Sequence, residues 1–181
     1  MRAYLNALLR LCILILLIFG LTTWLGFEAW VGDPLNWLRE LGAWAALINL
    51  LLLWSDVILP VPSSLCMIAN GSIFGVYYGA SLSLIGGVGA TLISYYIGKR
   101  YQSYMLSEMS ESERDEAYLY LTKWGAFAIV ISRPVPILAE SIAILSGTLP
   151  LSPLRLSAYA AIGHLIPCIL YAVTGAAIVS P

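Results

Sequence analysis

No charged side chain occurs between Val57 and Gly98, a stretch of 42 residues. As one α-helix this stretch would be about 63 Å long at 1.5 Å per residue, roughly twice the thickness of the hydrocarbon core of a bilayer. A segment of that length must fold back on itself inside a membrane. Helix-breaking residues predict where it turns, at Pro60 and Pro62 and again at Asn70-Gly71. We therefore expect a re-entrant hairpin that dips into the membrane and returns, followed by a helix that crosses it.

The composition of the whole chain predicts the same environment. The chain is 60% hydrophobic and 10% charged, whereas an ordinary soluble domain is about a quarter charged. Far more polar surface than this would be needed to keep 181 residues in water. The net charge of −1 offers no case for nucleic-acid binding. Cys12, Cys66 and Cys168 lie in apolar segments without C-x-x-C spacing, so we expect no metal site, disulfide or cofactor.

We expect two regions along the chain. We expect residues 1–40 to form an N-terminal anchor helix and an interfacial segment. The apolar run Leu11–Phe27 is not followed by a small-x-small cleavage site, so it is expected to stay as an anchor. Asp33-Pro34 favours the start of a short interfacial helix. Residues 41–181 predict a transport domain. Its expected order is hairpin 41–70, span 76–98, charged cytoplasmic helix 99–123, hairpin 124–150 and span 156–179, with Pro167 kinking the last span.

The sequence Pro-Val-Pro occurs twice, at Pro60–Pro62 and at Pro134–Pro136. Each copy is followed by a pair of residues that predicts a turn, Asn70-Gly71 in the first case and Ser146-Gly147 in the second. With the N-terminus inside, seven of the nine Lys and Arg residues fall on the cytoplasmic side, and the two hairpins enter from opposite sides. The sequence therefore predicts an all-α integral membrane protein in which transmembrane helices and two opposed re-entrant hairpins form an inverted repeat. Transporters with this arrangement bind their substrate near the middle of the bilayer.

Ionisable residues stand beside both breaks. Placing Arg133 in hydrocarbon costs about 3 kcal/mol of free energy on insertion scales. Its planar guanidinium group can donate two parallel hydrogen bonds to a phosphate. Asp56 and Glu140 are expected to bind protons more readily in a low-dielectric cavity unless an arginine is close, and this would couple transport to protons. The alternative is that both carboxylates only neutralise Arg133. The full set of candidate substrate- and proton-binding residues is Asp56, Pro60, Pro62, Ser63, Ser64, Asn70, Arg133, Pro134, Pro136 and Glu140, with Ser141 as a further hydrogen-bond donor.

Two stretches resemble a known family. "SRPVPILAESIAILSGTLPLSPLRLSAYAAIG" (Ser132–Gly163) resembles the second hairpin of the DedA/SNARE-associated (VTT-domain) membrane protein family, and "LPVPSSLCMIANGSIFGVYYG" (Leu59–Gly79) resembles its first. The family's aromatic-x-x-x-basic motif matches Tyr96–Arg100, and its Gly-x-x-x-apolar pattern matches Gly147–Leu151. The resemblance covers residues 40–178. It implies two facing re-entrant loops and a role in moving lipids between leaflets: undecaprenyl phosphate or phosphatidylethanolamine in bacteria, and phospholipid scrambling in eukaryotic relatives.

The chain departs from the bacterial pattern at several positions. Only Asp56 precedes the first Pro-x-Pro, and Ser63-Ser64 stand where a glutamate often follows it. Ala139 occupies the place of a second arginine, and Leu156 that of an aromatic residue. These differences favour the branch nearer the eukaryotic relatives and weaken the case for undecaprenyl phosphate as the substrate.

We expect a lipid flippase or scramblase that moves a phospholipid or polyprenyl phosphate between leaflets, with no enzymatic activity. The expected partners are membrane lipids with phosphate-bearing headgroups and protons; a homo-oligomer is left open. The expected location is a bacterial inner (plasma) membrane, with the N-terminus cytoplasmic. Two alternatives remain open from the sequence: a proton-coupled carrier of a small solute or ion, and a non-transporting membrane scaffold.

Overall fold

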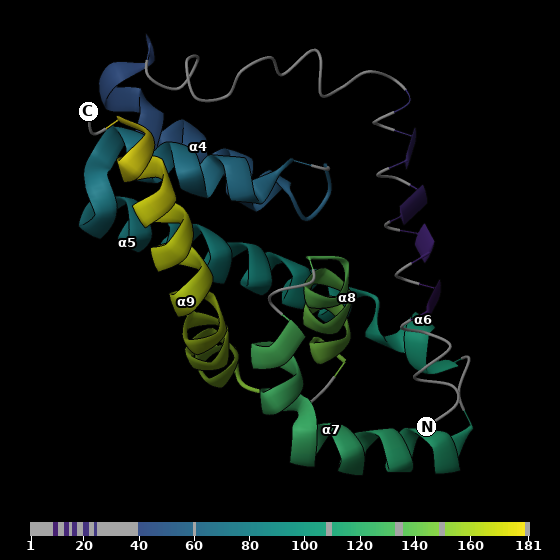
Figure 1. Cartoon of the computed structure of the whole chain (residues 1–181). Helices are drawn as coiled ribbons and strands as arrows, with labels where there is room; N and C mark the ends of the chain where they lie inside the picture. The colour runs from purple at the N-terminus through teal and green to yellow at the C-terminus, as the bar shows by residue number, and fades with distance from the viewer. Residues whose placement is uncertain are drawn as a thin grey trace. The chain divides into compact units, whose positions relative to one another are not determined.

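The computed structural model describes residues 9–10, 13–14, 16–17, 20–21, 24, 40–59, 61–107, 110–132, 136–148 and 151–179. Within these ranges the chain is helical and contains no strand, which confirms the predicted all-α class for the described residues (Figure 1). Most of the expected N-terminal anchor and the interfacial helix that begins at Asp33 lie outside the described residues.

Seven helical elements follow residue 40 in the described part of the chain. They are the 3-10 helix η1 (Gly42–Trp44) and the α-helices α4 (Ala45–Ser55), α5 (Ser63–Arg100), α6 (Gln102–Ser107), α7 (Glu111–Ser132), α8 (Pro136–Ser146) and α9 (Pro153–Val179). By length and composition, two of them can cross a membrane: α5 with 38 residues and α9 with 27. Helix α9 continues through Pro167 to Val179.

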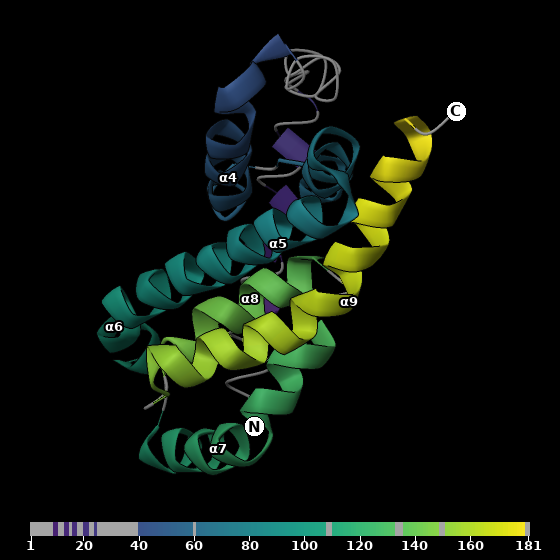
Figure 2. The same cartoon turned by 90° about the vertical axis from the view of Figure 1, so that its left-hand side faces the viewer.

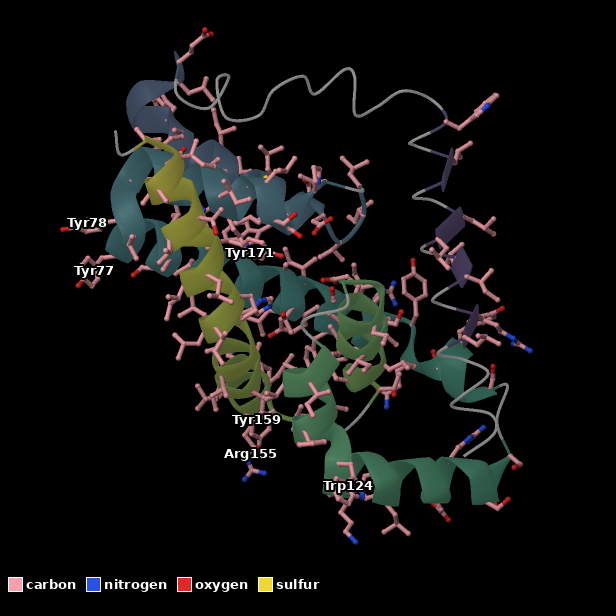
Figure 3. The ribbon with its side chains drawn as sticks, viewed as in Figure 1. Tyr77, Tyr78, Trp124, Arg155, Tyr159 and Tyr171 are labelled. Atoms are coloured by element: carbon pink, nitrogen blue, oxygen red, sulfur yellow. The ribbon has the colours of Figure 1, made fainter. Side chains whose placement is uncertain are left out.

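Helix α5 is interrupted at Gly75, where φ is +74° and ψ is 177°. This combination is open only to glycine, because a side chain there would strain the backbone. The ribbon bends sharply at this point, and Tyr77 and Tyr78 point outward beside the bend (Figures 1 and 3). After Gly75 the helix runs about 25 residues to Arg100, or roughly 37 Å, enough to cross a hydrocarbon core.

The turn that the sequence predicted at Asn70-Gly71 was wrong, since both residues are helical and the break comes at Gly75. The physical reason is packing. A Cβ atom on Gly71 would overlap the backbone of Ala172 on α9, so this glycine allows two helices to approach and does not turn the chain. The Asn70 side chain is fully buried and donates a hydrogen bond, so it does not cap a turn.

The charged segment predicted as one surface helix over 99–123 is divided between the end of α5, α6 and α7. Helix α7 also continues past Lys123 through apolar residues to Ser132. Its ribbon changes direction near Trp124, where the charged half meets the apolar half (Figure 3). The turn predicted at Ser146-Gly147 is confirmed, because α8 ends at Ser146.

The chain forms two compact units. The Asn70 unit comprises Ile18–Ala90 with His164–Pro181, and the Glu140 unit comprises Met1–Leu17 with Thr91–Gly163. The core of the Asn70 unit contains Leu53, Val61, Cys66, Met67 and Cys168. The core of the Glu140 unit is built by Tyr95, Ile129 and Leu156 from α5, α7 and α9, and α8 lies against α7 within it (Figure 2).

Candidate functional site

The first Pro-x-Pro separates α4 from α5. Helix α4 ends at Ser55, and the backbone N–H of Asp56 closes its last turn on the carbonyl of Leu52 at 3.2 Å. Asp56 is half-buried and interacts with another residue. Pro62 directly precedes α5, and its carbonyl accepts from the N–H of Leu65 at 2.9 Å, which starts the helix. The break therefore places one carboxylate at the point where the chain leaves helical geometry.

Ser63 and Ser64 are the first two residues of α5, and both are half-buried. The backbone N–H groups of a first helical turn have no partner inside the helix. These two serines thus lie at the N-terminal end of α5, where backbone donors and side-chain hydroxyl groups come together.

Two turns further along α5, Asn70 is fully buried. Its Nδ2 donates to the hydroxyl of Ser83 at 3.0 Å, and Ser83 is also fully buried. The bond joins the part of α5 before Gly75 to the part after it. A Cβ on Gly79 would lie 2.6 Å from the Asn70 carbonyl oxygen, so glycine permits the close approach. Asn70 therefore connects the two halves of the interrupted helix through a hydrogen bond.

Asn49 from α4 reaches the same region. Its side chain is fully buried, and Nδ2 donates to the backbone carbonyl of Cys66 at 3.0 Å. The close contact between α4 and α5 is completed by Gly86, where a Cβ would meet the side chain of Leu53. Asn49, Asn70 and Ser83 thus form a buried polar cluster around one turn of α5.

The Glu140 unit has a polar contact of a different kind. Glu140 lies on α8, and its Oε2 accepts a hydrogen bond from the Ser94 hydroxyl of α5 at 2.6 Å. This is a short hydrogen bond between two oxygen atoms. Ser94, Thr91 and Ser141 are fully buried, and Glu140 is half-buried.

Most hydroxyl groups on these helices bond back to their own helix. Ser132 donates to the Ile129 carbonyl at 3.1 Å, and Ser146 donates to that of Ala143 at 2.6 Å. Such local bonds satisfy a hydroxyl in apolar surroundings without a tertiary partner. The Ser94 hydroxyl instead reaches a carboxylate 46 positions away in the sequence, so this contact helps to hold Glu140 in place.

Glycines bring α8 close to the end of α5. A Cβ on Gly98 would overlap the Ile144 carbonyl oxygen, and one on Gly147 would lie 2.9 Å from the Gly98 carbonyl carbon. The Tyr95 hydroxyl donates to the Leu151 carbonyl at 2.8 Å, which holds the chain after the α8 turn. These contacts hold α8, and with it Glu140, against α5.

The structure leaves several candidate residues untested. Pro60, Arg133 and Pro134 lie outside the described residues, and for Pro136 only its position as the first residue of α8 is described. Asp56, Pro62, Ser63, Ser64 and Asn70 lie in the Asn70 unit, whereas Glu140 and Ser141 lie in the Glu140 unit.

Sequence reasoning missed the partners on α5. Small residues recur on this helix at intervals of three or four and are all buried: Gly79, Ser83, Gly87, Thr91, Ser94 and Gly98. The spacing keeps them on one helical face. Small residues on such a face let another helix approach closely. The three hydroxyl residues within that face were the available signal that it also carries polar contacts.

Two helices are long and apolar enough to cross a membrane, and one of them is interrupted at a glycine. Polar side chains are buried among apolar ones. These features are typical of a helical membrane protein. The VTT-domain family model matches residues 61–177. The chain therefore belongs to the VTT-domain family, the DedA/SNARE-associated Golgi family. No curated protein and no solved structure matches it significantly.

Proposed function

We propose that this VTT-domain protein moves a phospholipid or polyprenyl phosphate between the two leaflets of a membrane, as a flippase or scramblase without covalent catalysis. The observation that carries the proposal is Glu140, a half-buried carboxylate on an apolar helix that is held by a fully buried serine. An ionisable group among membrane-spanning apolar segments is expensive, and such groups usually mark the pathway of a substrate or ion.

The breaks supply the surroundings that a polar headgroup needs. Irregular backbone at membrane depth is tolerated only beside protein or a water-filled cavity. The first Pro-x-Pro lies between α4 and α5, and the second follows the last residue of α7, Ser132, and reaches the first residue of α8, Pro136. In this proposal Ser63 and Ser64 line the first break. Arg133 binds the headgroup phosphate at the second through its two parallel N–H groups.

We propose further that the two hairpins are an inverted repeat. Each unit by itself pairs a side chain from its broken hairpin with a serine of α5: Asn70 with Ser83 in one, and Glu140 with Ser94 in the other. Each also uses a glycine for close helix contact, Gly71 in the first unit and Gly147 in the second. Similar internal contacts support a common origin for the two halves.

In this mechanism protons act through Asp56 and Glu140. A carboxylate that is protonated in one conformation and ionised in the other ties the conformational change to proton movement, because a ligand shifts an equilibrium only through its different affinities for the two states. We place the protein in a bacterial inner membrane with its N-terminus in the cytoplasm. Its charged α7 segment then lies on the cytoplasmic side.

The test is lipid movement in proteoliposomes with and without an imposed pH gradient. Movement should respond to the gradient, and Asp56→Asn or Glu140→Gln should abolish the response. The exposed Ser81, whose hydroxyl bonds to its own helix at 2.8 Å, provides a control in Ser81→Ala. Movement that ignores the gradient would remove proton coupling. If no lipid moves under either condition, lipid transport itself is excluded.

A further inference from the structure

Two buried acceptor atoms of the Asn70 unit have no hydrogen-bond partner in the described part of the chain. They are Oδ1 of Asn49 and Oδ1 of Asn70. Both residues have no exposed surface. A buried polar atom without a partner costs about 1–3 kcal/mol, so two such atoms in one cluster point to a bound species that satisfies them.

One turn of α5 links the two amide groups. The Asn49 Nδ2 donates to the Cys66 carbonyl, and Cys66 and Asn70 are four residues apart on α5, one helical turn on the same face. Because that nitrogen is bonded to a carbonyl oxygen, the orientation of the Asn49 amide is fixed, and its other atom must be the acceptor. The third member, Ser83, accepts from Asn70 Nδ2 through its hydroxyl oxygen.

The cluster joins three segments: α4, α5 before Gly75 and α5 after Gly75. No lipid headgroup can reach atoms that have no exposed surface, so the bound species must be as small as a single atom or a water molecule. The first part of α5 ends at Gly75, five residues after Asn70. Both unpartnered atoms are acceptors, and a single cation can be held by several acceptor oxygens at once.

We propose that Asn49 Oδ1, Asn70 Oδ1 and Ser83 Oγ bind a monovalent cation, Na⁺. Hard cations prefer amide and hydroxyl oxygens. Because none of these three ligands is charged, the set suits one positive charge better than two. Interrupted transmembrane helices commonly hold coupling ions in this way. The cation would join both halves of α5 to α4 and so link its binding to the geometry of the break at Gly75.

This inference goes beyond the proposed lipid movement and can be tested without it. The purified full-length protein in detergent is titrated with NaCl, KCl or choline chloride at constant ionic strength. Thermal unfolding and tryptophan fluorescence are followed, and Trp54, five residues after Asn49 on α4, supplies a nearby reporter. We expect a saturable rise in melting temperature with Na⁺ that K⁺ and choline do not reproduce.

Variants assign the effect to the cluster. Asn49→Ala and Asn70→Ala should raise the half-saturating Na⁺ concentration by at least about tenfold, the low end of the loss when even a supporting group is removed from a metal site. Asn70→Asp should lower it, because a carboxylate adds charge. Ser72→Ala is the matched control, since Ser72 is half-buried on the same helix and bonds to its own helix at 3.0 Å.

Two results would overturn the proposal. Identical melting curves of the wild-type protein in the three salts would leave the cluster with a buried water molecule. A Na⁺ effect that persists unchanged in the alanine variants would place the ion elsewhere. If the alanine variants do not fold, Asn70→Asp and the wild-type titration decide the question. Lipid movement that proceeds normally in Na⁺-free buffer bears on coupling only and leaves the binding result untouched.

Discussion

Ser94→Ala removes the hydroxyl that donates to Glu140 at 2.6 Å. A hydrogen bond to a charged group contributes about 1.5–3 kcal/mol, and Ser94→Ala removes this donor from a half-buried carboxylate. For a protein of this length, 1 kcal/mol corresponds to about 2–4 °C in melting temperature. We therefore expect Ser94→Ala to lower the melting temperature by roughly 3–12 °C.

The assay is thermal unfolding of the full chain in detergent, arranged as a double-mutant cycle with Glu140→Gln. A neutral amide oxygen accepts a weaker bond, worth about 0.5–1.5 kcal/mol, so Ser94→Ala should cost about half as much in the Glu140→Gln background as in the wild-type protein. Ser81→Ala is the control, because Ser81 is exposed and bonds only within its own helix. A Ser94→Ala melting curve that matches the control, or equal costs in both backgrounds, would refute a charge-assisted bond.

Three further predictions follow from the same contacts and from the topology. Gly98→Ala should lower stability by about 1–3 kcal/mol, because its Cβ would overlap the Ile144 carbonyl oxygen. Gly20→Ala is the control and should not lower stability, since in the described part of the chain nothing lies within 4 Å of the added Cβ. Equal melting temperatures for the two variants would contradict close packing of α8 on α5. Arg133→Lys keeps the charge but loses the bidentate hydrogen-bond donor. Lipid transport by correctly inserted protein should therefore fall substantially. Full activity would show that Arg133 contributes only its positive charge. Single cysteines introduced at positions 110–116 should react with an impermeant thiol reagent only from the cytoplasmic side, and those at 32–36 only from outside. The described native cysteines, Cys66 and Cys168, are buried, so they should contribute little labelling. Labelling of both segments from one side would exclude opposed hairpins.

The sequence predicted helices from features that act locally. A charge-free run between residues 57 and 98 and prolines that cannot donate a backbone hydrogen bond were enough to predict a helical chain with a break at Pro60–Pro62. The turn after Ser146 followed from a glycine next to the end of α8. These features depend on composition and backbone chemistry, so no knowledge of tertiary contacts was needed.

The position of the second break could not be predicted in the same way. Gly71 and Gly75 look alike in the sequence, yet Gly71 contacts α9 and stays helical, whereas Gly75 takes a positive φ. Likewise, Glu140 was identified because a carboxylate stands out among apolar residues, but Ser94 was not, since a serine in an apolar helix usually bonds to its own backbone. Which serine has a distant partner depends on how the helices pack, and that is a tertiary property.

The most direct test of lipid transport is transbilayer exchange of a fluorescent phospholipid in proteoliposomes, without any imposed gradient. A membrane-impermeant reductant quenches only the outer-leaflet label in protein-free vesicles. With the wild-type protein and with Ser81→Ala, the inner-leaflet label should also be lost as lipids exchange, and Glu140→Gln should alter the rate. Quenching of wild-type vesicles that stops at the level of protein-free vesicles, for both a phospholipid and a polyprenyl phosphate, would contradict a role in moving lipids between leaflets.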